Sequence, residues 1–427
     1  GQFPSSLSFC CVALVGPMAQ SADAEASYSI MSPDERGKQV WLGRLAWPFA
    51  CVALCTASYL IGGQVAQHGH ELPKANATFA LEATAQPAWH PKIPPIYDSE
   101  PLAKNIIRRF DFFLMFGATF FNPEDKARQV GAWLAQDFVY DTVGFPNSWT
   151  LKGWCISGEE TEYRTAFPTT GFSQMLFFGT DEYATTTTYG NAHWMDELFG
   201  IPAPREWTYF RVTDFYSIRK TGPEQGLVNY NFMMIDFADM FRRVGRPVLP
   251  PAPLPEGFVM TAHADDGVPA PLSVVVAGRD HVAAKKAAAG AIYDGWVGGV
   301  PASKWWHRNL TFYGPGGIGM ATNVGEFQRH VLDLYHAAFT NRSVDEKMLF
   351  CEGNYCGAYG VLWGHHVGTW VGLPASGKRL GLRFGMHFRI VGGLVQEGWA
   401  IFDFPGLFTQ LGLDFFGRAR DAKLLRG

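Results

Sequence analysis

The stretch from Gly364 to Gly412 reads GHHVGTWVGLPASGKRLGLRFGMHFRIVGGLVQEGWAIFDFPGLFTQLG, and it predicts two strands followed by a short helix. Residues two apart lie on the same face of a strand. Alternate positions of the first strand are apolar, at Phe384, Met386, Phe388 and Ile390. In the second strand, one face carries Trp399, Ile401 and Asp403. Because Asp403 precedes Phe-Pro and Gly412 follows the last apolar turn, the helix has a start signal and a stop signal.

The same pattern occurs earlier in the chain, which therefore contains an internal repeat. An offset of 172 residues aligns identical residues along both copies, among them Trp133 with Trp305, Tyr163 with Tyr335, Tyr183 with Tyr355, His193 with His365 and Arg211 with Arg383. After a five-residue excess in the first copy, around residues 220–225, the offset becomes 167 and Asp236-Phe237 meets Asp403-Phe404. A single small indel in more than a hundred aligned residues indicates two copies of one domain.

The repeat divides the chain into segments. The expected order is an N-terminal polar or targeting segment (1–44), an apolar segment (45–63), a stalk (64–97), copy one (98–246), a Pro/Ala-rich linker (247–278) and copy two (279–427). Each copy begins with an apolar helix, at 102–115 and at 280–293, and continues with aromatic and β-branched strands between Gly and Pro turns. Helices followed by an antiparallel sheet predict an α+β fold.

Copy two resembles the SnoaL-like polyketide cyclase family. The family pattern reads roughly G-T-H-x-G-x(3)-G-I-P-P-T-G, then R-x-x-x-G-x-I-x-E-x-W-x-x-x-D, then Q-L-G, and copy two matches most of it in order between residues 364 and 412. Copy one matches more loosely, through 199–203, 211–216 and 226–236. The resemblance implies the nuclear transport factor 2-like fold, here as two tandem cone-shaped α+β barrels, each a curved antiparallel sheet wrapped on helices around an apolar pocket. It also implies cofactor-free aldol chemistry with an acidic residue as acid/base.

Copy one offers two candidate acids. Asp214 is the single acid in the apolar row Phe210, Val212, Tyr216 and Ile218. An unpaired carboxylate in a core is costly, so Asp214 is either functional or paired with a Tyr or His. Asp236 shares a face with Phe232 and Met234, and it acts either as a base with a raised pKa or as a helix N-cap, with Asp239 three residues on. We expect His193 to orient these acids, and Tyr216 and Phe232 to contact the ligand.

Copy two has a different set of candidates. Asp403 is again either an acid/base or an N-cap, while Met386 stands where copy one has Asp214. His366 falls on the motif His and is either a proton shuttle or a structural residue. The ligand-contacting candidates are Trp399, His365 and Trp370. No His, Cys or carboxylate spacing typical of a metal site recurs between the copies, so we expect no metal.

Composition excludes other classes. The 427 residues are 47% hydrophobic, 17% charged and 15% aromatic, with net charge −4 and no basic stripe, which disfavours disorder and nucleic-acid binding.

Residues 45–63 contain no charge and would span ~28 Å as a helix, close to a bilayer core. Basic residues precede this segment, so a single-pass signal anchor would place both copies on the lumenal or extracytosolic side. A cleaved targeting segment or a buried helix remains the alternative, and Met18 is an alternative start.

Cysteines and sequons are few. Cys351 and Cys356 flank a turn-like EGNY sequence and either form a disulfide in an oxidising compartment or remain reduced and buried. Asn76, Asn309 and Asn341 begin glycosylation sequons.

Together these features predict a membrane-tethered tandem protein that binds a hydrophobic, aromatic or polyketide-like molecule and performs aldol cyclisation or isomerisation. The alternative is a non-catalytic binding or scaffold protein. We also expect the two copies to pack on each other as a pseudo-dimer.

Overall fold

The computed structural model describes residues 93–114, 128–144, 150, 163, 165–257 and 281–422. The predicted membrane segment 45–63 lies outside this part of the chain, as do Met18, Asn76 and most of the stalk. Among the helices that are described, none has both the length and the apolar character needed to cross a bilayer.

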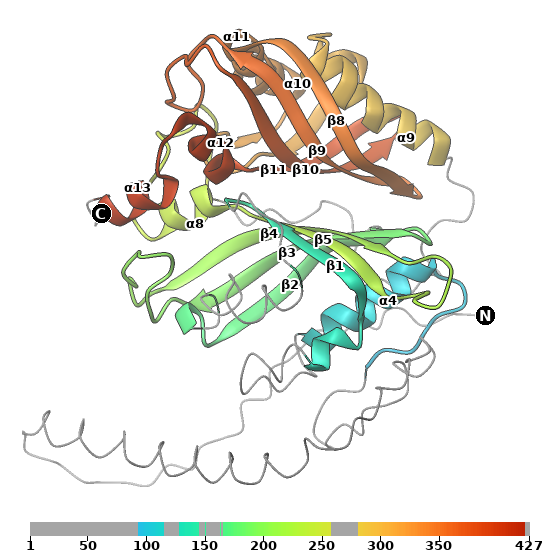
Figure 1. Ribbon diagram of the computed structural model, residues 1–427. Helices are drawn as coiled ribbons and strands as arrows, with labels where there is room; N and C mark the ends of the chain where they lie inside the picture. Colours follow the sequence, from blue (N-terminus) through green and yellow to red (C-terminus); the bar gives the residue numbers. More distant parts are fainter. Residues whose placement is uncertain are drawn as a thin grey trace, which may run out of the picture. The chain divides into compact units, whose positions relative to one another are not determined.

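Copy one forms a five-stranded sheet with a helix against it, and we call it domain one (Figure 1). Its strand order is β1-β5-β4-β3-β2. The elements are α4 (Leu102–Phe112), β1 (Leu134–Thr142), β2 (Thr170–Gly179), β3 (Tyr183–His193), β4 (Trp207–Ile218), β5 (Val228–Ile235) and α8 (Phe237–Arg243).

Copy two, which we call domain two, forms a six-stranded sheet of order β7-β6-β11-β10-β9-β8. Its strands are β6 (Trp306–Tyr313), β7 (Met320–Ala321), β8 (Phe339–Glu352), β9 (Tyr355–His366), β10 (Arg379–Val391) and β11 (Leu394–Phe402). Its α-helices are α9 (His281–Gly290), α10 (Val324–Phe327), α11 (Asp333–Ala338), α12 (Phe404–Leu411) and α13 (Phe415–Asp421). It also contains the short π-helices η4 (Ala291–Val297) and η6 (Gln328–Leu332) and the 3-10 helix η5 (Ala302–Lys304).

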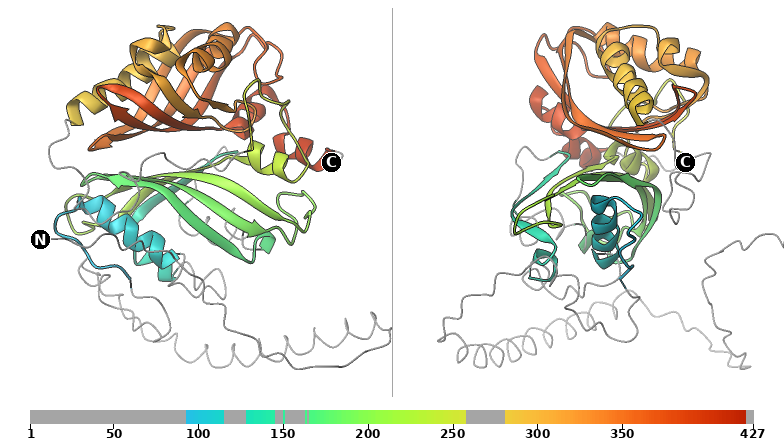
Figure 2. Two further views of the ribbon diagram at one scale, coloured as in Figure 1. Left: turned by 180° about the vertical axis from the view of Figure 1, so that it is seen from behind. Right: turned by 90° about the vertical axis from the view of Figure 1, so that its right-hand side faces the viewer.

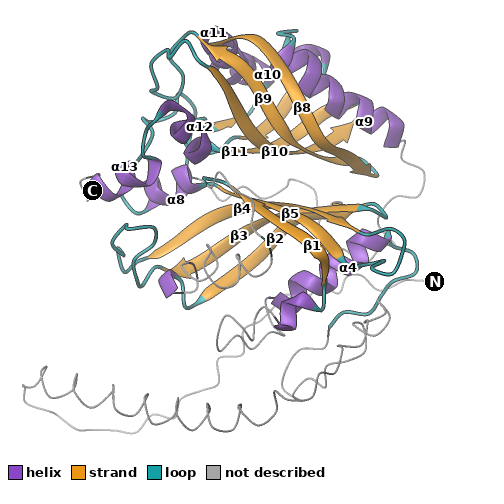
Figure 3. Ribbon diagram, in the orientation of Figure 1, coloured by secondary structure: helices purple, strands orange, loops and turns teal. Residues whose placement is uncertain are grey.

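The two domains repeat one topology. β3, β4 and β5 recur as β9, β10 and β11 at the offsets read from the sequence, and β7 extends the second sheet at its edge. The predicted α+β class is confirmed (Figure 3). The expectation of fully antiparallel sheets is wrong, because β1 pairs with β5 and β6 with β11 in parallel. In domain one, β2, β3, β4 and β5 are each antiparallel to the next, and β5 then lies parallel to β1, on the side of β4 away from β3.

Local sequence signals set the ends of the closing helices. The Asp236 side chain accepts a hydrogen bond from the Asp239 amide at the start of α8, and Asp403 accepts one from the Gly406 amide at the start of α12. Gly412 ends α12 in the left-handed region, at φ 75°. These caps satisfy amides and carbonyls that a helix end leaves without partners.

The central strands β4 and β10 are buried on both faces. Helix α4 lies in the concavity of the first sheet and α9 in that of the second, and the opposite faces of the two sheets meet (Figure 2). At their meeting, the Phe215 ring on β4 stacks 5.3 Å from the His387 ring on β10. These two positions are equivalent by the repeat, since they are 172 residues apart. Strands in this arrangement bury residues on both faces, so burial alone does not say which face lies toward a helix.

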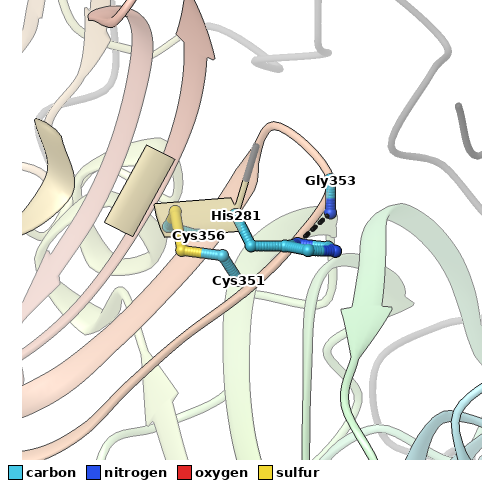
Figure 4. The surroundings of a disulfide bond; sticks show 4 residues. All are labelled: His281, Cys351, Gly353 and Cys356. Atoms are coloured by element: carbon cyan, nitrogen blue, oxygen red, sulfur yellow. Dashed lines mark hydrogen bonds between the residues drawn. A yellow bond between two sulfur atoms is a disulfide. The ribbon is translucent and has the colours of Figure 1, made fainter. Parts of the chain in front are cut away.

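A disulfide joins Cys351 and Cys356 at the end of the β8–β9 hairpin (Figure 4). The two cysteines are directly paired across the strands, and His281 at the start of α9 accepts a hydrogen bond from the Gly353 amide. Of the two alternatives that the sequence leaves open, the structure has the disulfide.

Candidate functional site

Asp214 lies on the helix-facing side of domain one. Asp214 is 7% exposed, and its Oδ1 accepts a hydrogen bond of 3.1 Å from the side-chain amide of Asn231 on β5. Tyr216, two residues along β4, is on the same face and is equally buried. The structure therefore confirms that Asp214 and Tyr216 share one face of β4, and this face lies toward α4.

Asp111, on α4, completes a cluster of acids that the sequence did not predict. Its Oδ1 accepts a hydrogen bond of 3.1 Å from the Tyr216 hydroxyl. Asp111 also interacts electrostatically with Asp214. It stands in a run of apolar and basic helix residues, where alternation gives no information, and no other signal in the sequence marks it.

Both carboxyl groups bind protons more tightly than ordinary aspartates. Burial raises the pKa of Asp214 from 3.8 to about 7, although its hydrogen bonds to Asn231 and Tyr216 act in the opposite direction. Burial and the neighbouring Asp214 charge raise the pKa of Asp111 well above its usual range. Two nearby carboxyls in a low-dielectric site do not both ionise readily, so we expect the pair to hold one proton near neutral pH.

Asp236 lies elsewhere, on the side of the first sheet that faces domain two. Besides capping α8, it approaches the Arg211 guanidinium at 3.5 Å and accepts the Gly316 amide of domain two at 3.2 Å. Burial and the Asp239 charge raise the pKa of Asp236 to about 6. A cavity of about 10 Å³ beside it has room for a single water.

Asp403 has the equivalent position in domain two. Its carboxylate accepts from Arg383 Nε at 2.7 Å and from the Gly144 amide of domain one at 3.0 Å. Gly144 and Gly316 are also equivalent by the repeat, so each domain's Asp holds the loop after the other domain's first strand. Both aspartates are N-caps, as one of the two interpretations predicted, and each also contacts a loop of the other domain and an arginine.

Phe232 and Trp399 accompany these aspartates on the faces between the domains. Phe232 stacks on Tyr359 of domain two at 4.1 Å. Trp399 is the register partner of His387 and stacks on Tyr313 at 5.2 Å. The sequence grouped these residues with their aspartates correctly, but the shared face lies against the other domain.

The structure separates His193 from Asp214. His193 Nε2 lies 3.0 Å from the Arg205 carbonyl oxygen, and its ring stacks on Trp207. Asp214 lies opposite Thr186 of β3 in the sheet, and Thr186 is seven residues before His193. Seven residues of strand span about 23 Å. His193 and Asp214 therefore do not form one site.

His366 and Trp370 lie together in domain two. The His366 ring stacks on Phe339 at 5.0 Å, and Trp370 meets Phe339 at 5.5 Å. Nδ1 of His366 lies 3.2 Å from the Ser376 hydroxyl, its buried Nε2 has no hydrogen-bond partner, and burial lowers its pKa. His365 precedes His366 on β9 and so points to the other face of the sheet.

Aromatic rings fill the helix-facing side of domain two around this pair. Contacts with centroid separations from 4.4 to 6.4 Å link Trp296, Trp306, Phe312, Phe327, Tyr335, Phe388 and Phe402. Met386, at the position of Asp214, is 1% exposed on the same face. Domain two thus has an apolar interior where domain one has an acid pair.

His387 is a buried histidine of the face between the domains. Its Nε2 lies 2.6 Å from the Thr185 hydroxyl and its Nδ1 2.7 Å from the Thr187 hydroxyl. Burial, with the Arg211 charge, lowers the pKa of His387 to about 3. The imidazole is therefore neutral at ordinary pH and contributes hydrogen bonds to domain packing.

The arrangement of domain two agrees with a known family. Residues 300–411 match the SnoaL-like polyketide cyclases. Domain two is therefore similar to the SnoaL-like polyketide cyclases. The SnoaL-like match covers the sheet from before β6 to the end of α12. Among the described residues, no group of three or more His, Cys, Asp or Glu is arranged to hold a metal.

Solved structures and curated proteins give further comparisons. TsrD from Streptomyces laurentii is 22% identical over 32% of this chain and 98% of its own, with a TM-score of 0.29. Wild-type IdmH from Streptomyces antibioticus is 19% identical over 30% of this chain and 99% of its own, with a TM-score of 0.28. The comparison with curated proteins gave no match.

Proposed function

We propose that domain one binds a hydrophobic, aromatic or polyketide-like small molecule and that Asp214 acts on it as a general acid/base. The observation that carries this proposal is the Asp214 carboxyl, buried opposite α4 with its pKa raised to about 7. A base is most effective when its pKa lies near the working pH. The similarity of domain two to the SnoaL-like polyketide cyclases supports small-molecule binding or cyclisation as the class of activity.

The roles of the neighbouring groups follow from their charges. As a carboxylate, Asp214 would take a proton from a carbon next to a carbonyl group, which leaves an enolate. The Tyr216 hydroxyl, or the protonated Asp111, would donate a hydrogen bond to the enolate oxygen. In an aldol cyclisation, the enolate carbon attacks a second carbonyl carbon, and the alkoxide formed there takes the proton from Asp214. In an isomerisation, the enolate regains the proton from Asp214 at another carbon.

Domain two would serve as the packing partner of domain one. Its helix-facing side has Met386 in place of Asp214 and is filled with aromatic rings. In this proposal the catalytic roles of Asp236, Asp403, His193 and His366 are secondary to that of Asp214. The membrane anchor at residues 45–63 remains a separate prediction.

Binding of 2-naphthol to the full chain tests this function, because a planar aromatic hydroxyl resembles an enol. We expect an intrinsic fluorescence change on binding, and an affinity that falls as pH rises through about 7, since ionised Asp214 repels the electron-rich ring oxygen. Asp214→Asn cannot ionise and should lose this pH dependence. Asp421→Asn, at an exposed residue, is the matched control. An unaltered pH dependence in Asp214→Asn, or no binding by the wild-type chain, would rule out the proposal.

A further inference from the structure

The end of the β8–β9 hairpin of domain two packs against domain one. Phe350 stacks on Tyr183 of β3 at 5.5 Å, and Tyr355 meets Phe178 of β2 at 5.9 Å. The disulfide between Cys351 and Cys356 closes the hairpin next to these contacts. The hairpin end is therefore held from within its own strands and against the neighbouring domain.

Glu352 lies inside the disulfide-closed hairpin end, and both of its carboxylate oxygens bind domain one. Oε1 accepts from Lys104 Nζ at 2.8 Å, and Oε2 accepts from the Gly179 amide at 2.8 Å. Glu352 is 8% exposed and Lys104 2% exposed. A buried ion pair recovers its desolvation cost only when its geometry is good and its remaining oxygens are bonded, as they are here.

These contacts fix the beginning of α4. Lys104 lies in the first turn of α4, and Gly179 ends β2 immediately before the turn that receives the helix. In that turn, the Thr180 carbonyl accepts from the Ala103 amide at 3.2 Å, and Asp181 accepts from the Leu102 amide at 3.0 Å. Glu352 thus links the helix and the turn through a third element, from the other domain.

The same helix carries Asp111 of the acid pair. Lys104 and Asp111 are seven residues apart, which places them two turns apart on one side of α4. A change in the direction of α4 at Lys104 must therefore alter the position of Asp111 relative to Tyr216 and Asp214. No other described contact joins the hairpin end to the acid pair as directly.

We propose that Glu352 of domain two is a positioning residue for the acid pair of domain one, acting through Lys104 and α4. This proposal rests on the proposed function, because it assigns the pair Asp214–Asp111 as the site that is positioned. It gives domain two a role in that site without a ligand of its own.

The test is the titration of the two aspartates in the full chain, by carbon NMR with ¹³C-carboxyl aspartate and with signals assigned from Asp111→Asn and Asp214→Asn. The groups that face Asp214 are Asp111 on α4, Tyr216 on β4, Asn231 on β5 and, through Tyr216, Tyr140 on β1. Glu352→Gln keeps the side-chain shape but removes the nearer of the two carboxylates at Lys104, at 2.8 Å; Glu100 lies 3.9 Å away. We expect the Asp214 midpoint to fall by about one pH unit, since a loosened α4 lets water reach the pair.

Two further variants make the result specific. Glu346→Gln removes a carboxylate of the same strand that bonds Tyr293 at the surface, and it should titrate like the wild type. The double variant Lys104→Met/Glu352→Met removes both charges, so it strands neither of them. We expect it to shift Asp214 as Glu352→Gln does. A wild-type midpoint in the double variant, or in Glu352→Gln, would overturn the positioning role.

The titration needs no ligand, so its outcome is independent of the proposed function. Failure of 2-naphthol to bind would count against the function while leaving the link from Glu352 to the acid pair measurable. An unshifted midpoint with normal 2-naphthol binding would remove the positioning role alone.

Discussion

Replacement of Arg383 by methionine is expected to lower the free energy of unfolding by about 3 kcal/mol. The guanidinium bonds Asp403 at 2.7 Å within domain two, and Asp141 and the Thr142 carbonyl of domain one, both at 2.7 Å. Asp403 is 2% exposed. Methionine fills much of the same volume but leaves one buried carboxylate, a second half-buried one and a carbonyl oxygen without their cation.

Urea unfolding of the full chain, followed by tryptophan fluorescence, measures this loss. Arg219→Met is the matched control, because Arg219 pairs with Asp137 at the surface, where both side chains are more than a third exposed. Such pairs contribute about 0–1 kcal/mol. Equal destabilisation by the two substitutions would show that Arg383 does not hold the domains together.

Arg383 also shows how much of the fold the sequence predicts. Its alignment with Arg211, and that of Asp403 with Asp236, follow from the repeat alone. In the structure both arginines contact the other domain, since Arg211 donates to the carbonyls of Tyr313 and Ala400. The repeat predicts that these residues are equivalent, but it does not predict that they link the two copies.

The faces of the strands illustrate the same limit. Alternation correctly groups Phe232 with Asp236 and Trp399 with Asp403, because side chains on a strand repeat every two residues. It cannot tell a face that lines a cone from a face that packs on another sheet, since both are apolar and buried. That distinction depends on how the two domains associate, a property that local sequence does not encode.

The sequence predicts only one of the two acids of the Asp214–Asp111 pair. Asp214 stands out as an acid in an apolar strand row, and the structure buries it as expected. Asp111 lies on a helix 103 residues earlier, beside two arginines, where an acid is unremarkable. Only the packing of α4 into the sheet brings Asp111 to Tyr216. Pairs of this kind require tertiary structure for their detection.

The second large effect that we expect is a gain in stability when Asp214 is replaced by asparagine. The pKa of Asp214 is raised from 3.8 to about 7 in the folded protein. Between these values the folded chain keeps a proton that the unfolded chain has released, so this group's contribution to stability falls as pH rises through that window. Above about pH 7 the folded chain carries a buried charge, and the loss is complete.

Asparagine remains neutral at every pH, and its carbonyl oxygen can still accept the Asn231 hydrogen bond. Asp214→Asn should therefore unfold with a free energy about 3 kcal/mol above that of the wild type at pH 8, and with little difference at pH 4. Urea unfolding of both proteins at intervals from pH 4 to pH 8 measures the difference. Asp236, with its raised pKa, and His387, with its lowered pKa, also titrate with folding, but they contribute to both proteins and cancel. Asp111 does not cancel, because the Asp214 charge helps to raise its pKa; loss of that charge in Asp214→Asn lowers the Asp111 pKa and acts in the same, stabilising direction.

The exposed Asp421→Asn substitution again provides the control, and its stability should follow the wild-type curve at every pH. Parallel curves for Asp214→Asn and the wild type would mean that Asp214 ionises in the folded chain as it does in water. A difference that opens between pH 4 and pH 7 would mean instead that the fold maintains a destabilising carboxyl in domain one. Selection for stability alone would not retain such a group, so this outcome would favour a chemical role for Asp214.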